Sequence, residues 1–202
     1  MFAYWTSGIF VLIVGALMVC PLGHCGISAL DRAGLEFAHG LRTPVLDSAM
    51  HAITWAGSLW LLLPLTALAG LHLAARGTPR AGLFLLGSLL GASALSHLVK
   101  LILARPRPDL FPSGLPLPLD WSYPSAHTMQ AFAIATAIVL LARRPHSALV
   151  AILLGGASVV SVSRIYLQVH YPSDVIAGML AAIFWVAGLH HWMFRRQAHP
   201  SA

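Results

Sequence analysis

Acidic residues are scarce in this sequence. The 202-residue chain holds six Asp and Glu against twelve Lys and Arg, a formal net charge of +6. Only 9% of its residues are charged and 58% are hydrophobic, whereas a soluble domain carries about 25% charged residues. Because so few charges cannot cover a soluble surface, we predict an integral membrane protein. The positive residues lie scattered between apolar runs and form no basic domain, so a nucleic-acid partner is not expected.

The N-terminal region lacks charge, and the chain has only two cysteines. No Asp, Glu, Lys or Arg occurs in residues 1–30, so a cleaved signal peptide with its cationic start is not expected. We interpret Cys20 and Cys25 as free thiols. A disulfide is the alternative if this end of the chain faces an oxidising compartment. A metal site on Cys20, His24 and Cys25 is not expected, because no fourth ligand is evident.

Long hydrophobic runs take the place of the missing charge. A transmembrane helix needs about 20 apolar residues, and six runs approach that length, near residues 3–22, 53–75, 81–103, 127–142, 147–163 and 173–194. The sequence therefore predicts an all-α fold: an integral membrane bundle of six transmembrane helices that forms a single domain over residues 1–202. The mixed segment 26–52 predicts a short interfacial helix after the first span. Thr43 and Pro44 have the pattern of a helix start within it.

The distribution of arginine predicts the orientation in the membrane. Arginine pairs lie between spans two and three, between spans four and five, and after span six: Arg76 and Arg80, Arg143 and Arg144, Arg195 and Arg196. Positive residues favour the cytoplasmic side, so both termini are expected there. All six acidic residues then fall on the opposite side. Small residues at Gly87 and Gly91, and over 155–158, predict close helix packing.

Three polar clusters fall on the same side as the acidic residues. The first contains Lys100, the only lysine, and Arg107, which follows the helix break at Pro106. Two cations at one membrane edge suit a phosphate. Arg105 is a plausible outer cation, but no spacing singles it out. The loop from 105 to 125 holds six prolines, at 106, 108, 112, 116, 118 and 124, which favour a semi-rigid wall of a pocket.

The second cluster opens the fourth span. Ser125 and Ala126 lie at the N-terminus of this helix, where unpaired backbone N–H groups favour a bound phosphate. The Ser125 hydroxyl can donate to the same anion, or it can serve only as the helix cap. His127, in the first helical turn, could give a proton to a leaving oxygen, although a lone histidine at this place is more often structural.

The third cluster joins Arg164, His170 and Asp174. The spacing of His170 and Asp174 lets the carboxylate reach one ring nitrogen, which leaves the other nitrogen to attack phosphorus. Arg164 would supply a bidentate fork for phosphoryl oxygens. No acidic pair and no histidine ligand set accompanies them, so neither a metal nor any other cofactor is expected.

These three clusters carry a resemblance to a known family. The chain resembles the type 2 phosphatidic acid phosphatase superfamily, which also includes the vanadium haloperoxidases. The resemblance covers residues 100–174 directly, through Lys100-x6-Arg107-Pro108, Pro124-Ser125-Ala126-His127 and Ser163-Arg164-x5-His170-x3-Asp174. The family usually has glycine where this chain has Ala126. Alanine retains the backbone N–H that an oxyanion needs, while it adds a methyl group.

The resemblance implies a role for each matched residue. His170 would attack phosphorus and form a phosphohistidine, Asp174 would orient it, and His127 would protonate the leaving group. The phosphoryl oxygens would be held by Lys100, Arg107, Ser125, Arg164 and the Ala126 N–H. The implied activity is a metal-independent lipid phosphatase or pyrophosphatase that acts at the periplasmic face of a bacterial inner membrane.

The substrate and two other functions stay open at this point. Resemblance to small bacterial members suggests undecaprenyl pyrophosphate as the lipid partner. Phosphatidylglycerol phosphate, phosphatidic acid and lipid A phosphates are close alternatives. A vanadate-dependent oxidoreductase on the same scaffold is disfavoured, because such members are larger and soluble. A non-catalytic lipid-phosphate binding protein is the remaining alternative.

Overall fold

The computed structural model describes residues 2–117, 119–142 and 144–194 of the chain. The expectations for Pro118, Arg143, Arg195 and Arg196 lie outside this part. Within it, every regular element is a helix, as the sequence predicts.

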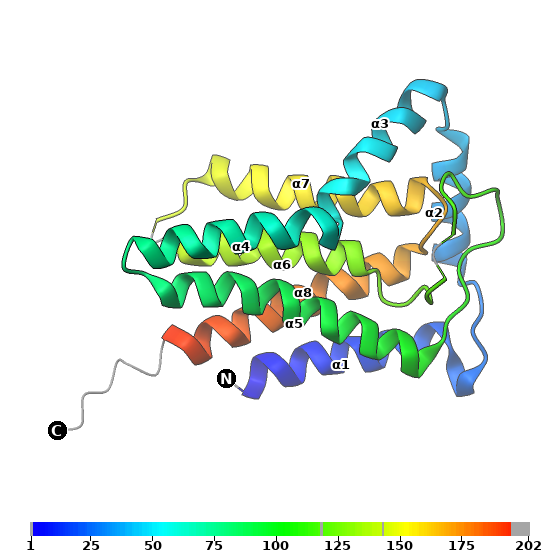
Figure 1. The fold of residues 1–202 in the computed structure, drawn as a ribbon. Helices are drawn as coiled ribbons and strands as arrows, with labels where there is room; N and C mark the ends of the chain where they lie inside the picture. Colours follow the sequence, from blue (N-terminus) through cyan, green and yellow to red (C-terminus); the bar gives the residue numbers. More distant parts are fainter. Residues whose placement is uncertain (1, 118, 143, 195–202) are drawn as a thin grey trace.

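In these described residues, eight α-helices and two short 3₁₀ segments follow one another. The α-helices are α1 (Phe2–Val19), α2 (Ala29–Gly40), α3 (Pro44–Thr54), α4 (Leu59–Ala75), α5 (Pro79–Leu103), α6 (Ala126–Leu141), α7 (Ser147–Tyr166) and α8 (Pro172–Phe194). The 3₁₀ segments are η1 (Pro21–Gly23) and η2 (Trp55–Gly57). Figure 1 shows α1 and α4 to α8 running alongside one another, with α2 and α3 at one end of this bundle.

Three of the helices are long and apolar enough to cross a membrane: α5, α7 and α8. A fourth crossing results if α3 with η2 and α4 count as one span bent by 45°. The bend lies between Gly57 and Leu59, whereas Pro64 lies inside the continuous helix α4. Helices α1 and α6 are apolar but shorter. By length and composition alone, the described residues therefore contain three candidate membrane spans, or four if the bent pair counts as one span.

Side-chain caps fix the helix starts at the end of the bundle where α2 and α3 lie. Thr43 caps α3 by accepting the Leu46 N–H, with Pro44 as the first helical residue, so the predicted helix start is confirmed. Ser28 caps α2 in the same way through the N–H of Asp31. These caps set where α2 and α3 begin, beside the loops that close the site.

Small residues let α8 pack closely against α1 and α5. A side chain at Gly91 would lie 2.0 Å from the Trp185 ring, and one at Gly188 would lie 2.4 Å from Trp5. Close packing at Gly91 is thus confirmed. The same prediction is wrong for Gly155 and Gly156 on α7, where an added Cβ would meet nothing within 4 Å.

Cys20 and Cys25 form a disulfide, so the free-thiol interpretation is wrong. The bridge closes the short turn that contains η1, directly after α1. This turn lies at the same end of the bundle as α2 and the 104–125 loop (Figure 1). The α4–α5 turn and the end of α8 lie at the other end, beside the N-terminus.

Candidate active site

The three polar clusters converge on one cavity at the end of the bundle that carries α2. The cavity has a volume of about 480 Å³. Six of the eight predicted site residues line it: Lys100, Arg107, Ala126, His127, Arg164 and His170. The other two, Ser125 and Asp174, are fully buried behind its wall.

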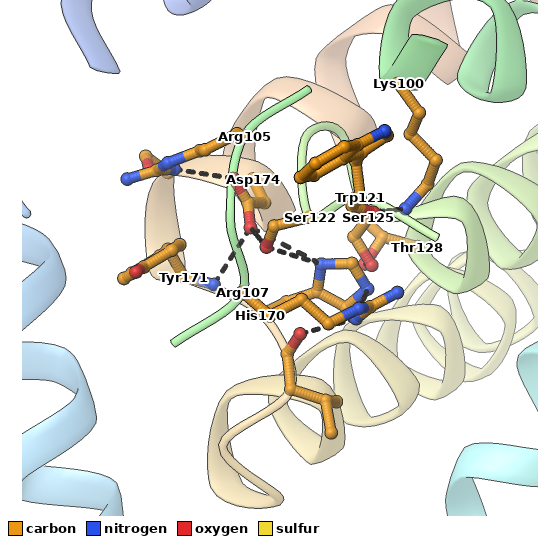
Figure 2. A network of polar contacts seen from close by, with 12 residues as sticks. Lys100, Arg105, Arg107, Trp121, Ser122, Ser125, Thr128, His170, Tyr171 and Asp174 are labelled. Carbon is orange, nitrogen blue, oxygen red and sulfur yellow. Dashed lines mark hydrogen bonds and ion pairs between the residues drawn. The ribbon is translucent and has the colours of Figure 1, made fainter. Parts of the chain in front are cut away.

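His170 lies between a cation and a carboxylate (Figure 2). Its Nδ1 is 3.4 Å from Oδ2 of Asp174, and its Nε2 is 3.2 Å from Nη1 of Arg107. Because a guanidinium can only donate, Nε2 is the acceptor in this contact and Nδ1 carries the proton that faces Asp174. The geometry therefore fixes the tautomer that leaves the Nε2 lone pair on the cavity side.

The surroundings of His170 keep its imidazole neutral. Burial, followed by the charges of Arg107 and Lys100, lowers the pKa of the His170 imidazole well below its usual range. A neutral ring keeps a lone pair for attack on phosphorus.

The Asp174 carboxylate is held from several sides. Its Oδ1 pairs with Nη1 of Arg105 at 2.6 Å. Its Oδ2 accepts from the Ser122 hydroxyl at 2.5 Å and from the backbone N–H of Tyr171 at 3.0 Å. Asp174 lies in the first turn of α8, where the helix dipole also favours a negative charge. These contacts leave the carboxylate little freedom to turn away from His170.

Arg105 joins Asp174 to a second buried acid. Its Nη2 pairs with Oδ2 of Asp31 at 2.8 Å, and its guanidinium lies 3.9 Å above the centre of the Tyr171 ring. Asp31 in turn accepts from the backbone N–H and the hydroxyl of Ser173, at 2.9 and 2.8 Å. Burial alone lowers the pKa of Arg105, but Asp174 and Asp31 outweigh burial and raise it. Arg105 thus faces away from the cavity, toward α2 and α8.

Lys100 and Arg107 share one carboxylate, that of Asp120. Lys100 Nζ lies 3.1 Å from Oδ2, and Arg107 Nη2 pairs with Oδ1. Burial raises the pKa of the Asp120 carboxyl, but Lys100 and Arg107 outweigh this effect and lower it to about 2. Asp120 also lines the cavity, and nothing in its sequence spacing marked it as a site residue.

Arg164 contributes a third cation to the cavity wall. Its Nη1 donates to the hydroxyl of Thr54 at 2.6 Å. Its Nε is buried with no hydrogen-bond partner among the described residues, and the guanidinium forms no ion pair with any of them. A buried, unpaired guanidinium beside a cavity favours an anion there.

The start of α6 forms the remaining wall. Ser125 is the N-cap residue of α6, but its side chain makes no capping hydrogen bond; its Oγ accepts from the Thr128 hydroxyl at 3.1 Å. The capping interpretation of Ser125 is therefore wrong. Ala126 and His127 follow on the cavity side, with Gln130 one turn later. His97, which sequence reasoning left outside the site, also lines the cavity.

No cluster of three or more His, Cys, Asp or Glu residues in the described part of the chain could hold a metal ion. The cavity is lined by three histidines, two arginines, one lysine and the Asp120 carboxylate, with Asp174 buried behind its wall. The sequence matches the PAP2 superfamily over residues 81–198, more than half of the chain. The chain belongs to the PAP2 superfamily.

Two curated members of this superfamily are similar in sequence to this PAP2 protein. An undecaprenyl-diphosphatase from Sulfolobus acidocaldarius is 35% identical over 149 residues, which cover 71% of this chain and 68% of the relative. A phosphatidylglycerophosphatase B from Bacillus subtilis is 31% identical over 172 residues, 80% of this chain and 84% of the relative. PAP2 proteins so named are hydrolases, and this chain is a membrane phosphatase of the same family.

Two solved structures share the PAP2 fold. A transmembrane PAP2-type phosphatidylglycerolphosphate phosphatase from Bacillus subtilis superposes with a TM-score of 0.81 at 25% identity, over 99% of this chain and all of the other. LpxE from Aquifex aeolicus gives a TM-score of 0.67 at 27% identity, over 80% of this chain and 95% of the other. The all-helical fold of this PAP2 protein is therefore that of membrane phosphatases.

Proposed function

We propose that this chain is a metal-independent lipid phosphatase that uses His170 as its nucleophile. The observation that carries the proposal is the His170 ring, whose Nδ1 faces Asp174 while Nε2 faces the cavity and Arg107. Cations on three sides of the same cavity would hold the phosphoryl oxygens: Lys100, Arg107 and Arg164. The Ser125 hydroxyl accepts from Thr128, which leaves its own proton for the phosphate, and the Ala126 N–H at the start of α6 completes the cradle.

The reaction proceeds in two displacements. In the first, Nε2 of His170 forms a bond to phosphorus and the bond from phosphorus to the lipid oxygen breaks. His127 gives its proton to that oxygen, so the leaving group departs without the extra negative charge of the broken bond. In the second, water attacks the phosphohistidine, His127 takes up a proton from that water, and the P–N bond breaks. Inorganic phosphate leaves, and His170 regains its lone pair.

Undecaprenyl pyrophosphate, hydrolysed to undecaprenyl phosphate, is the proposed substrate. The relative of higher identity carries the name undecaprenyl-diphosphatase, which supports this choice. Phosphatidylglycerol phosphate is the second candidate, because the phosphatidylglycerolphosphate phosphatase structure matches nearly the whole of this chain. Both substrates place a terminal phosphoryl group on a lipid anchor, which a cavity at the end of a helical bundle suits.

We further propose a six-span arrangement in a bacterial inner membrane, with α2 as the interfacial helix, both termini in the cytoplasm and the cavity at the periplasmic face. The Cys20–Cys25 disulfide at the cavity end supports an oxidising compartment on that side. The exposed side chains of Leu30, Phe37 and Leu41 on and just after α2 would lie against the membrane surface.

The test is phosphate release from purified protein in detergent, with and without a chelator. Undecaprenyl pyrophosphate, phosphatidylglycerol phosphate, phosphatidic acid and a lipid A phosphate are compared as substrates. His170→Ala is expected to abolish release, whereas His146→Ala, the same change on an exposed residue at the other end of α7, leaves release unchanged. Retained turnover in His170→Ala would remove His170 from its role. Tight binding of the lipid with no release would favour a non-catalytic binding protein.

A further inference from the structure

The carboxylate of Asp120 lies where an anionic ligand of Lys100 and Arg107 would lie. Its two oxygens take one cation each: Oδ2 is 3.1 Å from Lys100 Nζ, and Oδ1 pairs with Arg107 Nη2. Carboxylates and phosphates are recognised by these side chains through the same oxygen geometry. Asp120 therefore occupies the anion position of these two cations.

All three side chains line the cavity, but the Asp120 carboxylate is far more exposed than the two cations. The side chains of Lys100 and Arg107 are 2% and 7% exposed, whereas that of Asp120 is 39% exposed. An anion that enters the cavity therefore meets the carboxylate before it can reach either cation. Repulsion between the two anions opposes entry unless Asp120 moves aside.

The loop that carries Asp120 also binds both cations through its backbone carbonyl groups. The Asp120 carbonyl accepts from Arg107 Nε at 3.0 Å, and the Trp121 carbonyl accepts from Lys100 Nζ. These contacts do not involve the carboxylate, so they can persist when the Asp120 side chain rotates away. The Asp120 side chain can then move away and return while the backbone of the loop stays bound to both cations.

Arg164 lines the same cavity but, unlike Lys100 and Arg107, has no acidic partner among the described residues. It forms no ion pair among the described residues, and its Nε is buried without a partner. The cavity thus presents one cation without a counter-ion and two cations that share the single negative charge of Asp120. A phosphoryl group would bind to Arg164 directly, but it would have to replace Asp120 to reach Lys100 and Arg107.

We propose that Asp120 is a displaceable counter-ion of the phosphate site, whose carboxylate binds Lys100 and Arg107 between turnovers and gives way to the phosphoryl group of the substrate. This inference rests on the proposed phosphate site. If Asp120 competes in this way, the protein is expected to bind free inorganic phosphate only weakly. After the P–N bond breaks, the returning carboxylate competes with inorganic phosphate for the same two cations and drives the product out.

The neutral variant Asp120→Asn tests the competition. In calorimetric titrations of the purified full-length protein with inorganic phosphate, it is expected to lower the Kd by about ten- to a hundredfold, the effect of losing one charged competitor. Asp120→Glu retains the charge and is expected to bind phosphate as the parent does. Asp109→Asn is the matched control: it removes the same charge from an exposed residue of the same loop that forms no ion pair among the described residues, and its Kd is expected to stay unchanged.

An anchoring role for Asp120 gives the opposite result. If the carboxylate served to hold Lys100 and Arg107 in place, Asp120→Asn would weaken phosphate binding, and an unchanged or higher Kd overturns the proposal. Asp120→Ala is a second neutral variant if Asp120→Asn does not fold. Because the titration needs no turnover, tighter binding in a protein that hydrolyses no lipid would sustain this inference while the proposed function failed. If neither the parent nor Asp120→Asn binds phosphate, this inference is overturned, whereas the proposed function is tested separately by lipid hydrolysis.

Discussion

Arg105 and Asp174 form an ion pair of 2.6 Å in which the side chains are 1% and 0% exposed. The second partner of Arg105, Asp31, is equally inaccessible and lies 2.8 Å away on the other arm of the guanidinium. Removal of one member of a buried ion pair leaves an uncompensated charge and lowers the free energy of unfolding by about 3–5 kcal/mol. Arg105 therefore links the fold of α2 to the orientation of Asp174.

We expect Arg105→Gln to lower the free energy of unfolding by about 3–5 kcal/mol and to lower kcat with little change in KM. The reason for the kcat effect is that Asp174 loses the partner that directs Oδ2 toward His170. Thermal unfolding in detergent and steady-state kinetics measure the two effects. Arg105→Lys, which keeps one charge, is expected to recover part of kcat. A destabilised Arg105→Gln protein with the kcat of the parent would show that Arg105 serves the fold alone.

The variant Asp31→Asn removes the charge of one of the two carboxylates that Arg105 binds and leaves the other, Asp174, in place. Arg105 and Asp174 remain a balanced pair in this variant, so we expect a smaller loss of kcat than in Arg105→Gln. Because the N–H and the hydroxyl of Ser173 bind different oxygens of Asp31, the single amide oxygen of the variant can keep only one of these two bonds. If both variants lost kcat equally, Arg105 would not act on kcat by orienting Asp174.

Loss of His127 is expected to affect substrates according to their leaving group. When a diphosphate is cleaved, the leaving lipid phosphate is a weak base and needs little protonation, whereas a monoester must expel an alkoxide. We expect His127→Ala to slow single-turnover release of the lipid product by about 10²–10⁴-fold for phosphatidic acid, and by much less for undecaprenyl pyrophosphate. Equal slowing for both lipids would show that His127 does not act as the general acid of the first displacement.

The sequence was informative about the site because its residues stand at helix ends with fixed spacing. His170 and Asp174 are four residues apart across the start of α8, so local geometry alone brings Nδ1 near the carboxylate. Lys100 and Arg107 flank the end of α5 in the same way. The positions of these residues follow from where each helix begins and ends, which apolar runs and prolines indicate.

The partners of these residues could not be predicted, because they are selected by contacts between distant parts of the chain. Asp31 contacts Ser173 across 142 residues, and Arg105 contacts Asp174 across 69. One signal was available: an acid in a membrane protein seldom lacks a partner, and this chain has only six acidic residues. Asp31 and Asp120 could have been sought as partners of the clustered cations on that ground.

The imidazole of His170 is expected to stay neutral in the folded protein at pH values where free histidine is charged. Its pKa is lowered by burial, by Arg107 and Lys100, and by Arg164 and His127. Nitrogen NMR of ¹⁵N-histidine protein, with His170 assigned from a His170→Gln sample, should show its ring nitrogens unchanged between pH 8 and 6. An imidazolium signal at pH 6 would contradict this.

The lowered pKa of His170 also makes the free energy of unfolding depend on pH. As the pH falls below about 6.5, the unfolded chain takes up a proton at His170 and the folded chain does not. The contribution of His170 to the free energy of unfolding is therefore full above that pH and declines as the pH falls. We expect His170→Gln to reduce the slope of the melting temperature against pH in this range, and an unchanged slope would show that other groups set it.

The disulfide offers a direct test of which side of the membrane the cavity faces. Cys20 and Cys25 are bonded, and they lie at the cavity end of the bundle. After mild reduction of intact spheroplasts, a membrane-impermeant maleimide should label Cys25, the more exposed of the two thiols, if that end is periplasmic. The matched control is Thr78→Cys in a Cys20→Ser, Cys25→Ser background, which places one thiol in the α4–α5 turn at the opposite end. This thiol should react only after the membrane is opened, and labelling in the reverse order would place the cavity in the cytoplasm.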